Sequence, residues 1–393
     1  MKVAQASLLF PFLLVSYEIA NYLSNDMYLP ALPEMMRDLN LSLQQVQLTL
    51  TTWFIGSAIL PLFLGMFADR FGRRPILLWG GVVYIISTIV CAVTSDVSVL
   101  LTARFIEGAA IPTMMVAGYA CIHELYEQKE TIRILALMSS VMILAPAFGP
   151  LLGSFILLVT SWRGIFWYIA IHSAISIVLL WWYMPETLPK DSRKPIIFKT
   201  VVRQYLNMLM NKRFMFLMIV LGFIFTGFIV WITAGPLLVI DHLHYSPTVF
   251  GIAQAIIFIA YMIASYLVKY LIEIIGVHTL IKLGLMITLA GGIACILSAL
   301  IFSQYLIPFV FAFTIYSVGS ALCFAPLNRF IIESSDEPMG MRVSLFTVLW
   351  TLFAVLGSFI ASIWYDGSIV SIALPIMLAI SISCIMYLFI PSR

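Results

Sequence analysis

Two acidic residues inside the first apolar segment are the strongest candidates for chemistry in this chain. Glu18 and Asp26 lie in a stretch that is otherwise hydrophobic and long enough to cross a bilayer. On a helix they are about 12 Å apart along the axis and about 80° apart around it. Tyr22 falls between them in angle and Asn25 lies about 20° to the other side of Glu18, so the four polar residues form one stripe. Ionisable groups at membrane depth are costly, and they indicate function by default.

The stripe has two interpretations. It could be a buried polar network that fixes helix packing, although packing alone does not require two carboxylates. We favour a proton and substrate site. Burial and nearby cations act in opposite directions on the charge of a carboxylate. A group balanced between them can accept a proton on one side of the membrane and release it on the other.

Arg104 is the only basic residue well inside an apolar segment, and it is the expected counter-charge. Glu107 follows three positions later, on the same face of the helix. Either these two residues neutralise each other, or Arg104 bonds backbone or carboxylate groups of the first helix and Glu107 is a further protonatable site. Met138 and Met142 could line an adaptable apolar pocket. A core or lipid-facing position is the alternative for both methionines.

The composition identifies the elements that must position these residues. Hydrophobic residues make up 62% of the chain and charged residues only 10%, with a mean hydropathy of +1.07. A soluble domain needs a more charged surface. Apolar runs of spanning length recur from end to end and predict an all-α membrane protein with twelve transmembrane helices. The first six are expected at 8–30, 43–68, 75–94, 98–121, 132–158 and 164–184. The second six are expected at 214–239, 247–270, 278–302, 305–333, 341–364 and 368–390.

These helices divide the chain into an N-terminal bundle (1–184), a basic linker (185–213) and a C-terminal bundle (214–393). Residues 195–210 of the linker mix apolar side chains with Lys199 and Arg203, which favours a helix lying on an anionic membrane face over a plain basic linker. Nearly all Lys and Arg residues fall on one side of this topology; the exceptions are Arg37, Arg104 and Arg163. The positive-inside rule makes that side cytoplasmic, together with both termini.

A loop rich in glycine and arginine joins the second and third helices. Its notable residues are Gly65, Asp69, Arg70, Gly72, Arg73 and Arg74. The glycines permit a tight turn and a close approach of helices, and Asp69 can pair with an arginine or cap a helix. We interpret the loop as a charged latch that closes the cytoplasmic side in one conformational state; simple anchoring by positive charge is the alternative.

Two further patterns concern the packing of helices. A shift of 204 residues places Asp69, Gly72 and Gly80 onto Glu273, Gly276 and Gly284, as a six-plus-six duplication would. Parallel repeats of this kind hold their substrate at mid-membrane between the halves. The fifth helix carries Pro146, Gly149, Pro150 and Gly153, which predict a bent seam between helices, although a static kink fits equally well. Ser42 and Gln45 form a capping-box pattern at the start of the second helix.

These motifs resemble those of the major facilitator superfamily. Residues 65–75 match the signature G-x-x-x-D-R-x-G-R-R-P at every fixed position, and residues 149–153 resemble the antiporter motif G-P-x-x-G. Residues 104–108 resemble the helix-four motif R-x-x-q-G, with Glu107 in place of the usual Gln. The spacing of Glu18 and Asp26 resembles the first helix of twelve-helix drug/proton antiporters of bacterial inner membranes. In those proteins the two carboxylates serve proton and cationic drug binding.

The resemblance implies two six-helix bundles around a central cavity and proton-coupled multidrug efflux by alternating access, a route to antibiotic resistance. Export of one metabolite or siderophore, and proton-coupled uptake, are the competing transport functions. The expected partners are a small-molecule substrate, protons, the bilayer and anionic lipid at the linker, and the architecture works as a monomer. No nucleic acid, metal or other cofactor is expected, because the chain has no HExxH or Walker A motif. An enzyme is not expected either, since no Ser or Cys nucleophile with a plausible His and acid can be assembled.

Overall fold

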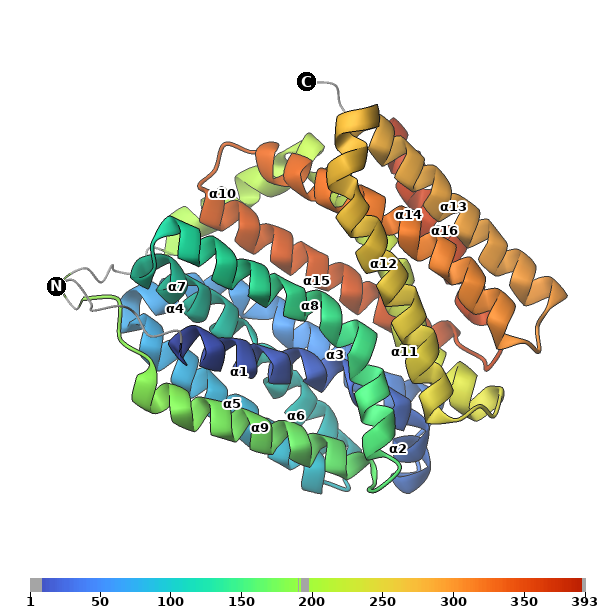
Figure 1. The fold of residues 1–393 in the computed structure, drawn as a ribbon, viewed down its shortest axis with the longest axis horizontal. Coiled ribbons are helices and arrows are strands. Elements are labelled where there is room, and N and C mark those ends of the chain that lie inside the picture. The colour runs from blue at the N-terminus through green and yellow to red at the C-terminus, as the bar shows by residue number, and fades with distance from the viewer. Residues whose placement is uncertain (1–8, 190, 192–197, 391–393) are drawn as a thin grey trace.

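A computed structural model of the chain describes residues 9–189, 191 and 198–390, and every regular element in these ranges is a helix (Figure 1). By length and composition, nine helices of this part can cross a membrane, and the bent pair formed by α3 and α4 makes a tenth. The remaining two spans are α1, which carries the polar stripe, and α8. Helices therefore occur at all twelve positions where the sequence predicts spans, and up to ten of them are long and apolar enough to cross a membrane.

The first half of the chain contains six spans and a short outer excursion. The first span, α1 (Leu9–Asp26), ends four residues earlier than expected. The chain continues in the short helices η1 (Leu29–Ala31) and α2 (Leu32–Asp38), because Pro30 and Pro33 cannot extend an α-helix from within. The other spans of this half are α3 (Leu43–Ile59) with α4 (Pro61–Phe71), α5 (Arg73–Val93), α6 (Val97–Ala110) with η2 (Met114–Gly118) and α7 (Tyr119–Leu125), α8 (Gln128–Ile156) and α9 (Trp162–Tyr183).

The second half repeats this arrangement after the linker helix α10 (Phe198–Met210). Its spans are α11 (Lys212–Pro236) with the π-helical η4 (Leu237–His242), α12 (Pro247–Ile275), α13 (Val277–Ile301), α14 (Leu306–Glu333), α15 (Met339–Trp364) and α16 (Val370–Leu388). Figure 1 shows the blue-to-green half beside the yellow-to-red half. The two halves meet mainly where α3 packs on α15 and where α8 packs on α12.

The 204-residue shift corresponds to a repeated local structure. Gly72 ends α4 with φ of 106°, and Gly276 ends α12 with φ of 76°. Positive φ favours glycine, so each half uses a single glycine to turn the chain between its second and third spans. Gly80 then packs against Thr113 of the fourth span, and Gly284 packs against Gly319 of the tenth. The same pair of spans is therefore brought into close contact in each half.

The linker helix α10 is amphipathic in the part that the structure describes. Tyr205 turns inward and donates a hydrogen bond from its hydroxyl to Ser344 Oγ at 3.1 Å. Asn211, which follows the helix, donates to the carbonyl of Ser334 at 2.8 Å. The side chains of Lys199 and its neighbours 192–201 lie outside the described part. Exposed apolar side chains cover the outer face and are suited to a membrane surface: Val202, Leu206, Leu209 and Met210.

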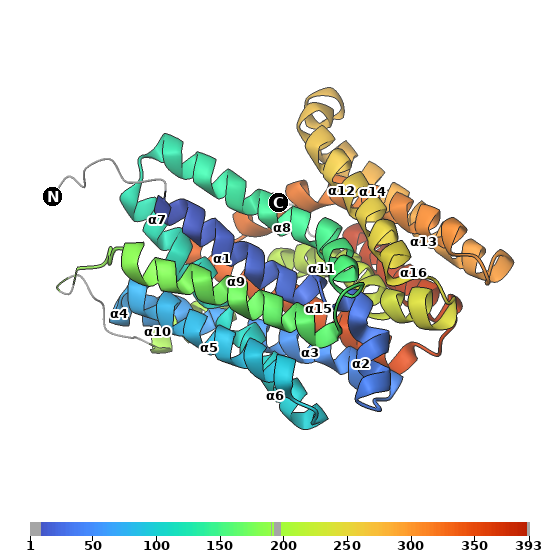
Figure 2. The same ribbon diagram turned by 60° about the horizontal axis from the view of Figure 1, so that its bottom comes forward.

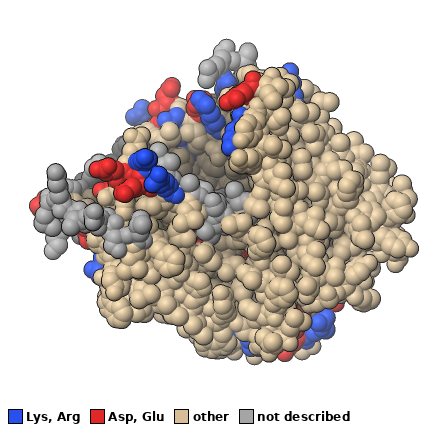
Figure 3. All heavy atoms as spheres, in the orientation of Figure 1, with Lys and Arg blue, Asp and Glu red and all other residues tan. Residues whose placement is uncertain are grey.

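The two halves close over one end of the molecule and leave a hollow at the other. At the end that carries α2, Arg37 Nη1 lies 3.7 Å from Asp241 Oδ1 of η4. On the same side η1 packs on α11 and α12. Figure 3 shows a hollow on the opposite side, between clusters of charged side chains. The described structure is therefore closed at the α2 end and open at the basic end.

Candidate functional site

Glu18 and Asp26 lie in the interior, as the polar stripe predicts. Helix α1 packs between α8 and α9, which Figure 2 shows on either side of it. Glu18 has no exposed surface and Asp26 is 2% exposed. Among the described residues, no ion pair joins either carboxylate to a basic side chain. Two acidic groups are thus held at membrane depth without a protein counter-charge.

Glu18 has a phenolic partner from the fourth span. The hydroxyl of Tyr119 donates to Glu18 Oε1 at 2.8 Å, whereas Glu18 Oε2 has no hydrogen-bond partner. Tyr119 directly follows the π-helical turn η2, and such wide turns occur frequently at functional sites. Sequence reasoning missed Tyr119, because a tyrosine in an apolar segment is no signal in a chain with 17 of them.

Asp26 lies among polar groups that are only partly satisfied. Asn25 donates from Nδ2 to Asp26 Oδ1 at 3.2 Å, while Asn25 Oδ1 is buried without a partner. Both amide atoms of Asn21, one turn earlier, also lack partners. Tyr22 is half-buried between the two carboxylates on the same helix. Buried polar atoms are nearly always bonded, so this group is suited to water, protons or a polar substrate atom.

Arg104 and Glu107 form a closed ion pair. Arg104 Nη1 lies 2.6 Å from Glu107 Oε2, and neither side chain is exposed. Thr88 donates to the other oxygen, Glu107 Oε1, at 2.9 Å. Arg104 reaches the first span only through the carbonyl of Ser24, at 3.2 Å, and its guanidinium lies 4.4 Å from the ring centre of Tyr28. Of the two interpretations, the geometry favours mutual neutralisation, combined with a backbone contact and no carboxylate contact to helix one.

The arginine-rich motif forms a network within the N-terminal half. Arg73 lies 2.7 Å from Asp69 Oδ1 and 3.4 Å from Glu124 Oε1, and its backbone N–H donates to Glu186 at 3.1 Å. Arg74 donates to the carbonyl of Trp181. The expected loop is reduced to Gly72 alone, since α4 and α5 flank it directly.

Two residues of this motif have no close role in the open arrangement. Arg70 is exposed, and a Cβ atom at Gly65 would meet nothing within 4 Å. No helix therefore approaches Gly65 closely here. The latch at these two positions stays a prediction.

The proline- and glycine-rich motif forms the seam between three helices. A Cβ atom at Gly149 would lie 2.8 Å from the Cβ of Asp26, and one at Gly153 would overlap the carbonyl of Met27. On its other side the motif meets α12, where a Cβ at Gly251 would lie 2.8 Å from the Cα of Leu151. Both prolines, Pro146 and Pro150, lie inside α8, and Figure 1 shows this helix changing direction towards its C-terminal end. The motif therefore links the Asp26 region to the other half.

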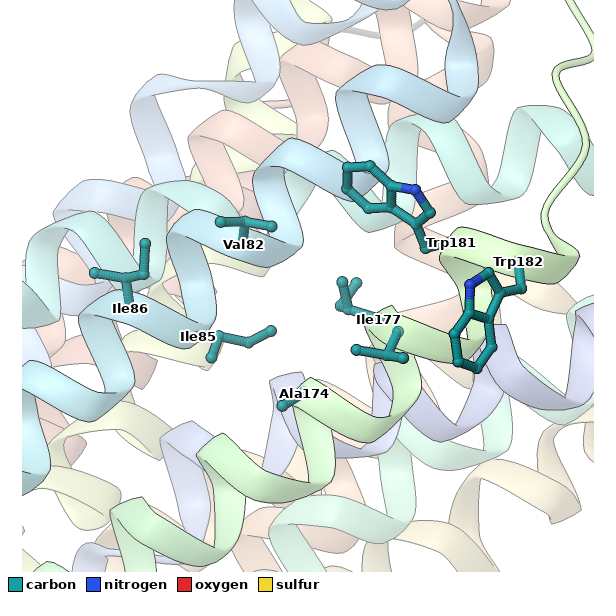
Figure 4. Close-up of a pocket in the computed structure, with 8 residues that line it drawn as sticks. Val82, Ile85, Ile86, Ala174, Ile177, Trp181 and Trp182 are labelled. Atoms are coloured by element: carbon teal, nitrogen blue, oxygen red, sulfur yellow. The ribbon is translucent and has the colours of Figure 1, made fainter.

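Met138, one of the two predicted methionines, and an apolar surface groove lie away from the carboxylates' hydrogen bonds. Met138 is fully buried, while the side chain of Met142 lies outside the described part of the structure. Figure 4 shows an apolar groove of about 310 Å³ between α5 and α9 on the N-terminal half. It lacks the convergent polar groups of a substrate site. Its lining residues are Val82, Ile85, Ile86, Ala174, Ile177, Val178, Trp181 and Trp182.

Two repeated bundles of six spans, with unpaired carboxylates at membrane depth, define a secondary transporter rather than an enzyme. The sequence profile of the Major Facilitator Superfamily matches residues 14–358. The chain belongs to this superfamily.

Named relatives are similar over most of the chain. The multidrug transporter MdfA of Escherichia coli O6:H1 is 30% identical over 93% of this chain and 89% of its own length. MdfA of Yersinia pestis bv. Antiqua is 29% identical over the same shares. The chloramphenicol resistance protein CraA of Acinetobacter baumannii is 28% identical over 88% of this chain and 83% of its own length.

Solved structures share the fold at low identity. A POT family transporter in complex with 5-aminolevulinic acid has a TM-score of 0.78 at 13% identity and covers 99% of this chain and 98% of its own. A D-xylose-proton symporter has a TM-score of 0.74 at 17% identity, with 98% of each chain covered. The expected major facilitator fold is confirmed.

Proposed function

We propose that this protein exports lipophilic drugs, cationic and neutral, across the bacterial inner membrane in exchange for protons. The observation that carries the proposal is the pair of buried carboxylates, Glu18 and Asp26, which have no basic partner among the described residues. Because Glu107 takes up the charge of Arg104, a proton or a cationic substrate is the species left to neutralise them.

The arrangement of the halves supports a direction of transport. Placing the basic end on the cytoplasmic side follows the positive-inside rule and leaves both termini inside. The hollow then opens to the cytoplasm, and the Arg37–Asp241 contact lies at the outer end. Substrate would enter from within, displace protons from the helix-one carboxylates and leave outside after the bundles rock. The printed names of the relatives, which include multidrug transporters and a chloramphenicol resistance protein, agree with drugs as cargo.

The roles of the motifs follow from the same scheme. The Gly149–Gly153 segment would act as the sliding seam next to Asp26, and the Asp69–Arg73–Glu124 network would support the cytoplasmic latch. Tyr22, Asn25 and Tyr119 would hold water or substrate beside the carboxylates. The unit is a monomer, with α10 resting on anionic lipid. No cofactor is required beyond the proton gradient.

The test uses the purified protein in liposomes that contain a pH-sensitive dye. Ethidium, tetraphenylphosphonium and then neutral drugs are added to wild type, Asp26→Asn and Glu18→Gln, with Asp336→Asn as a control that removes an exposed carboxylate. Substrate-driven proton movement that Asp26→Asn abolishes and Asp336→Asn retains is the expected result. If folded protein moves no protons with any of these compounds, the proposal of drug export is wrong. Export of a specific metabolite or siderophore then becomes the leading function.

A further inference from the structure

We propose that a cavity in the C-terminal bundle binds the phosphate headgroup of an anionic phospholipid. The cavity has a volume of about 970 Å³ and lies at the basic end of the molecule. It is formed by the start of α11 and α13 and by the ends of α12, α14 and α16. It belongs to one bundle, so it is separate from the carboxylate site on α1.

Positive charge converges on this cavity. Arg213, Arg329 and His278 line it, and Glu333 is its one acidic lining residue. Arg329, whose side chain is 76% exposed, donates from Nε to Glu333 Oε1 at 2.8 Å, which leaves its two Nη nitrogens out of that contact. Arg213 is half-buried and forms no ion pair with a described acidic residue. A planar guanidinium donates two parallel bonds to phosphate, so the pair of arginines is suited to that group.

The N-terminus of α13 adds donors to the same place. Gly276 starts the helix with positive φ, and Val277 and His278 in the first turn line the cavity. The first backbone N–H groups of a helix have no partner within it and carry a partial positive charge. The ring of His278 lies 5.3 Å from that of Phe330, which holds the imidazole at the wall. The start of α13 and the two arginine side chains therefore lie around the same cavity.

The remaining lining favours a lipid over a soluble phosphate. Beside the charged groups the walls are apolar, and the helix ends place the cavity at the membrane surface. A soluble anion gains nothing from such walls, whereas the glycerol and upper acyl carbons of a lipid bury apolar area there. The apolar lining residues are Leu217, Ile272, Val277, Ile281, Ala325, Pro326, Phe330, Tyr387 and Ile390.

The experiment measures lipid binding to the full-length protein by native mass spectrometry and by thermal shift. Phosphatidylglycerol is titrated against phosphatidylcholine, and inorganic phosphate is titrated alone. Wild type should prefer phosphatidylglycerol, and Arg213→Gln and Arg329→Gln should each weaken its binding about tenfold, the effect of losing a hydrogen bond between charged groups. Glu333→Gln should strengthen it, because it removes the opposing charge.

Two matched variants distinguish lipid binding in the cavity from non-specific attraction between basic residues and anionic lipid. Lys212→Gln removes an equal charge next to Arg213 but outside the lining, and it should leave binding unchanged. Ala325→Trp fills the cavity without a change of charge, and it should abolish the preference. Equal effects of Lys212→Gln and Arg213→Gln, or retained binding in Ala325→Trp, would overturn the proposal. Stabilisation by inorganic phosphate that phosphatidylglycerol does not reproduce would overturn the lipid as the source of the phosphate.

Discussion

Gly149 in α8 lies directly against Asp26 in α1: a Cβ atom on the glycine would come within 2.8 Å of the Cβ of the aspartate. Four residues later, Gly153 meets the carbonyl of Met27 in the same way. The absence of side chains at these two positions is what lets the fifth span touch the carboxylate-bearing helix. The proline- and glycine-rich motif thus sets the distance between a candidate proton carrier and the seam of the two halves.

The first prediction concerns this contact. Gly149→Ala and Gly153→Ala should each lower the free energy of unfolding of the purified protein by about 1 to 3 kcal/mol, as overpacking does. Both should also reduce substrate-driven transport. Gly340→Ala is the matched control, because a Cβ there meets nothing within 4 Å. Unfolding in detergent and transport in liposomes provide the measurements. Equal tolerance of alanine at all three positions would remove the case for a close-packed seam.

The second prediction concerns the buried ion pair. Arg104→Met or Glu107→Leu alone leaves one uncompensated charge, and each should cost about 3 to 5 kcal/mol of unfolding free energy. The double substitution Arg104→Met with Glu107→Leu should cost much less than the sum of two single losses. A double-mutant cycle measures this coupling. Strictly additive losses would show that the two side chains do not depend on each other.

The third prediction concerns the contact between the halves at the outer end. Arg37 is exposed and Asp241 is half-buried near the surface, so Asp241→Ala should change the free energy of unfolding by no more than about 1 kcal/mol. It should still favour separation of α2 from η4, because the contact holds them together. Distances between spin labels on these two elements report the change. Asp38→Asn disrupts an ion pair that stays within the N-terminal half, and a matching change in that control would argue against a specific outer contact.

The fourth prediction concerns pH. Hydrogen bonds from Arg163, and then Trp162, hold the pKa of Asp38 below its ordinary value. Since the pKa is lower in the folded than in the unfolded chain, this contact stabilises the protein above about pH 4, and the benefit is lost as the pH falls through the folded pKa. The melting temperature of wild type should therefore exceed that of Asp38→Asn at pH 7 and converge with it in acid. If the difference in melting temperature between wild type and Asp38→Asn stays constant down to pH 3, the Asp38 carboxylate is not its cause.

Local patterns in the sequence predict the frame of the molecule well. Hydrophobic runs give the twelve spans, and the capping box at Ser42 is confirmed by its reciprocal bonds with Gln45. The stripe containing Glu18 and Asp26 does face the interior, because helical spacing fixes which residues share a face.

The partners of these residues are not predictable in the same way. Tyr119 and Glu18 are 101 residues apart, and nothing local aligns them. Their contact depends on how the fourth span is rotated against the first, and the π-helical turn before Tyr119 alters that rotation. The choice between partners for Arg104 is likewise made by packing. The early end of α1, in contrast, could have been predicted from the sequence, because Pro30 disfavours continuation of the helix.

The closed pair of Arg104 and Glu107 bears on electrogenicity. The two charges cancel within one helix, so the pair adds no net charge to a rocking bundle. Over a complete cycle the protein returns to its starting state, so exchange of one proton for a monovalent cation would be electroneutral and driven by the pH difference alone. Exchange of one proton for an uncharged drug would move one charge, worth about 2.3 kcal/mol per 100 mV. In a carrier with this layout, voltage sensitivity would be a property of the cargo.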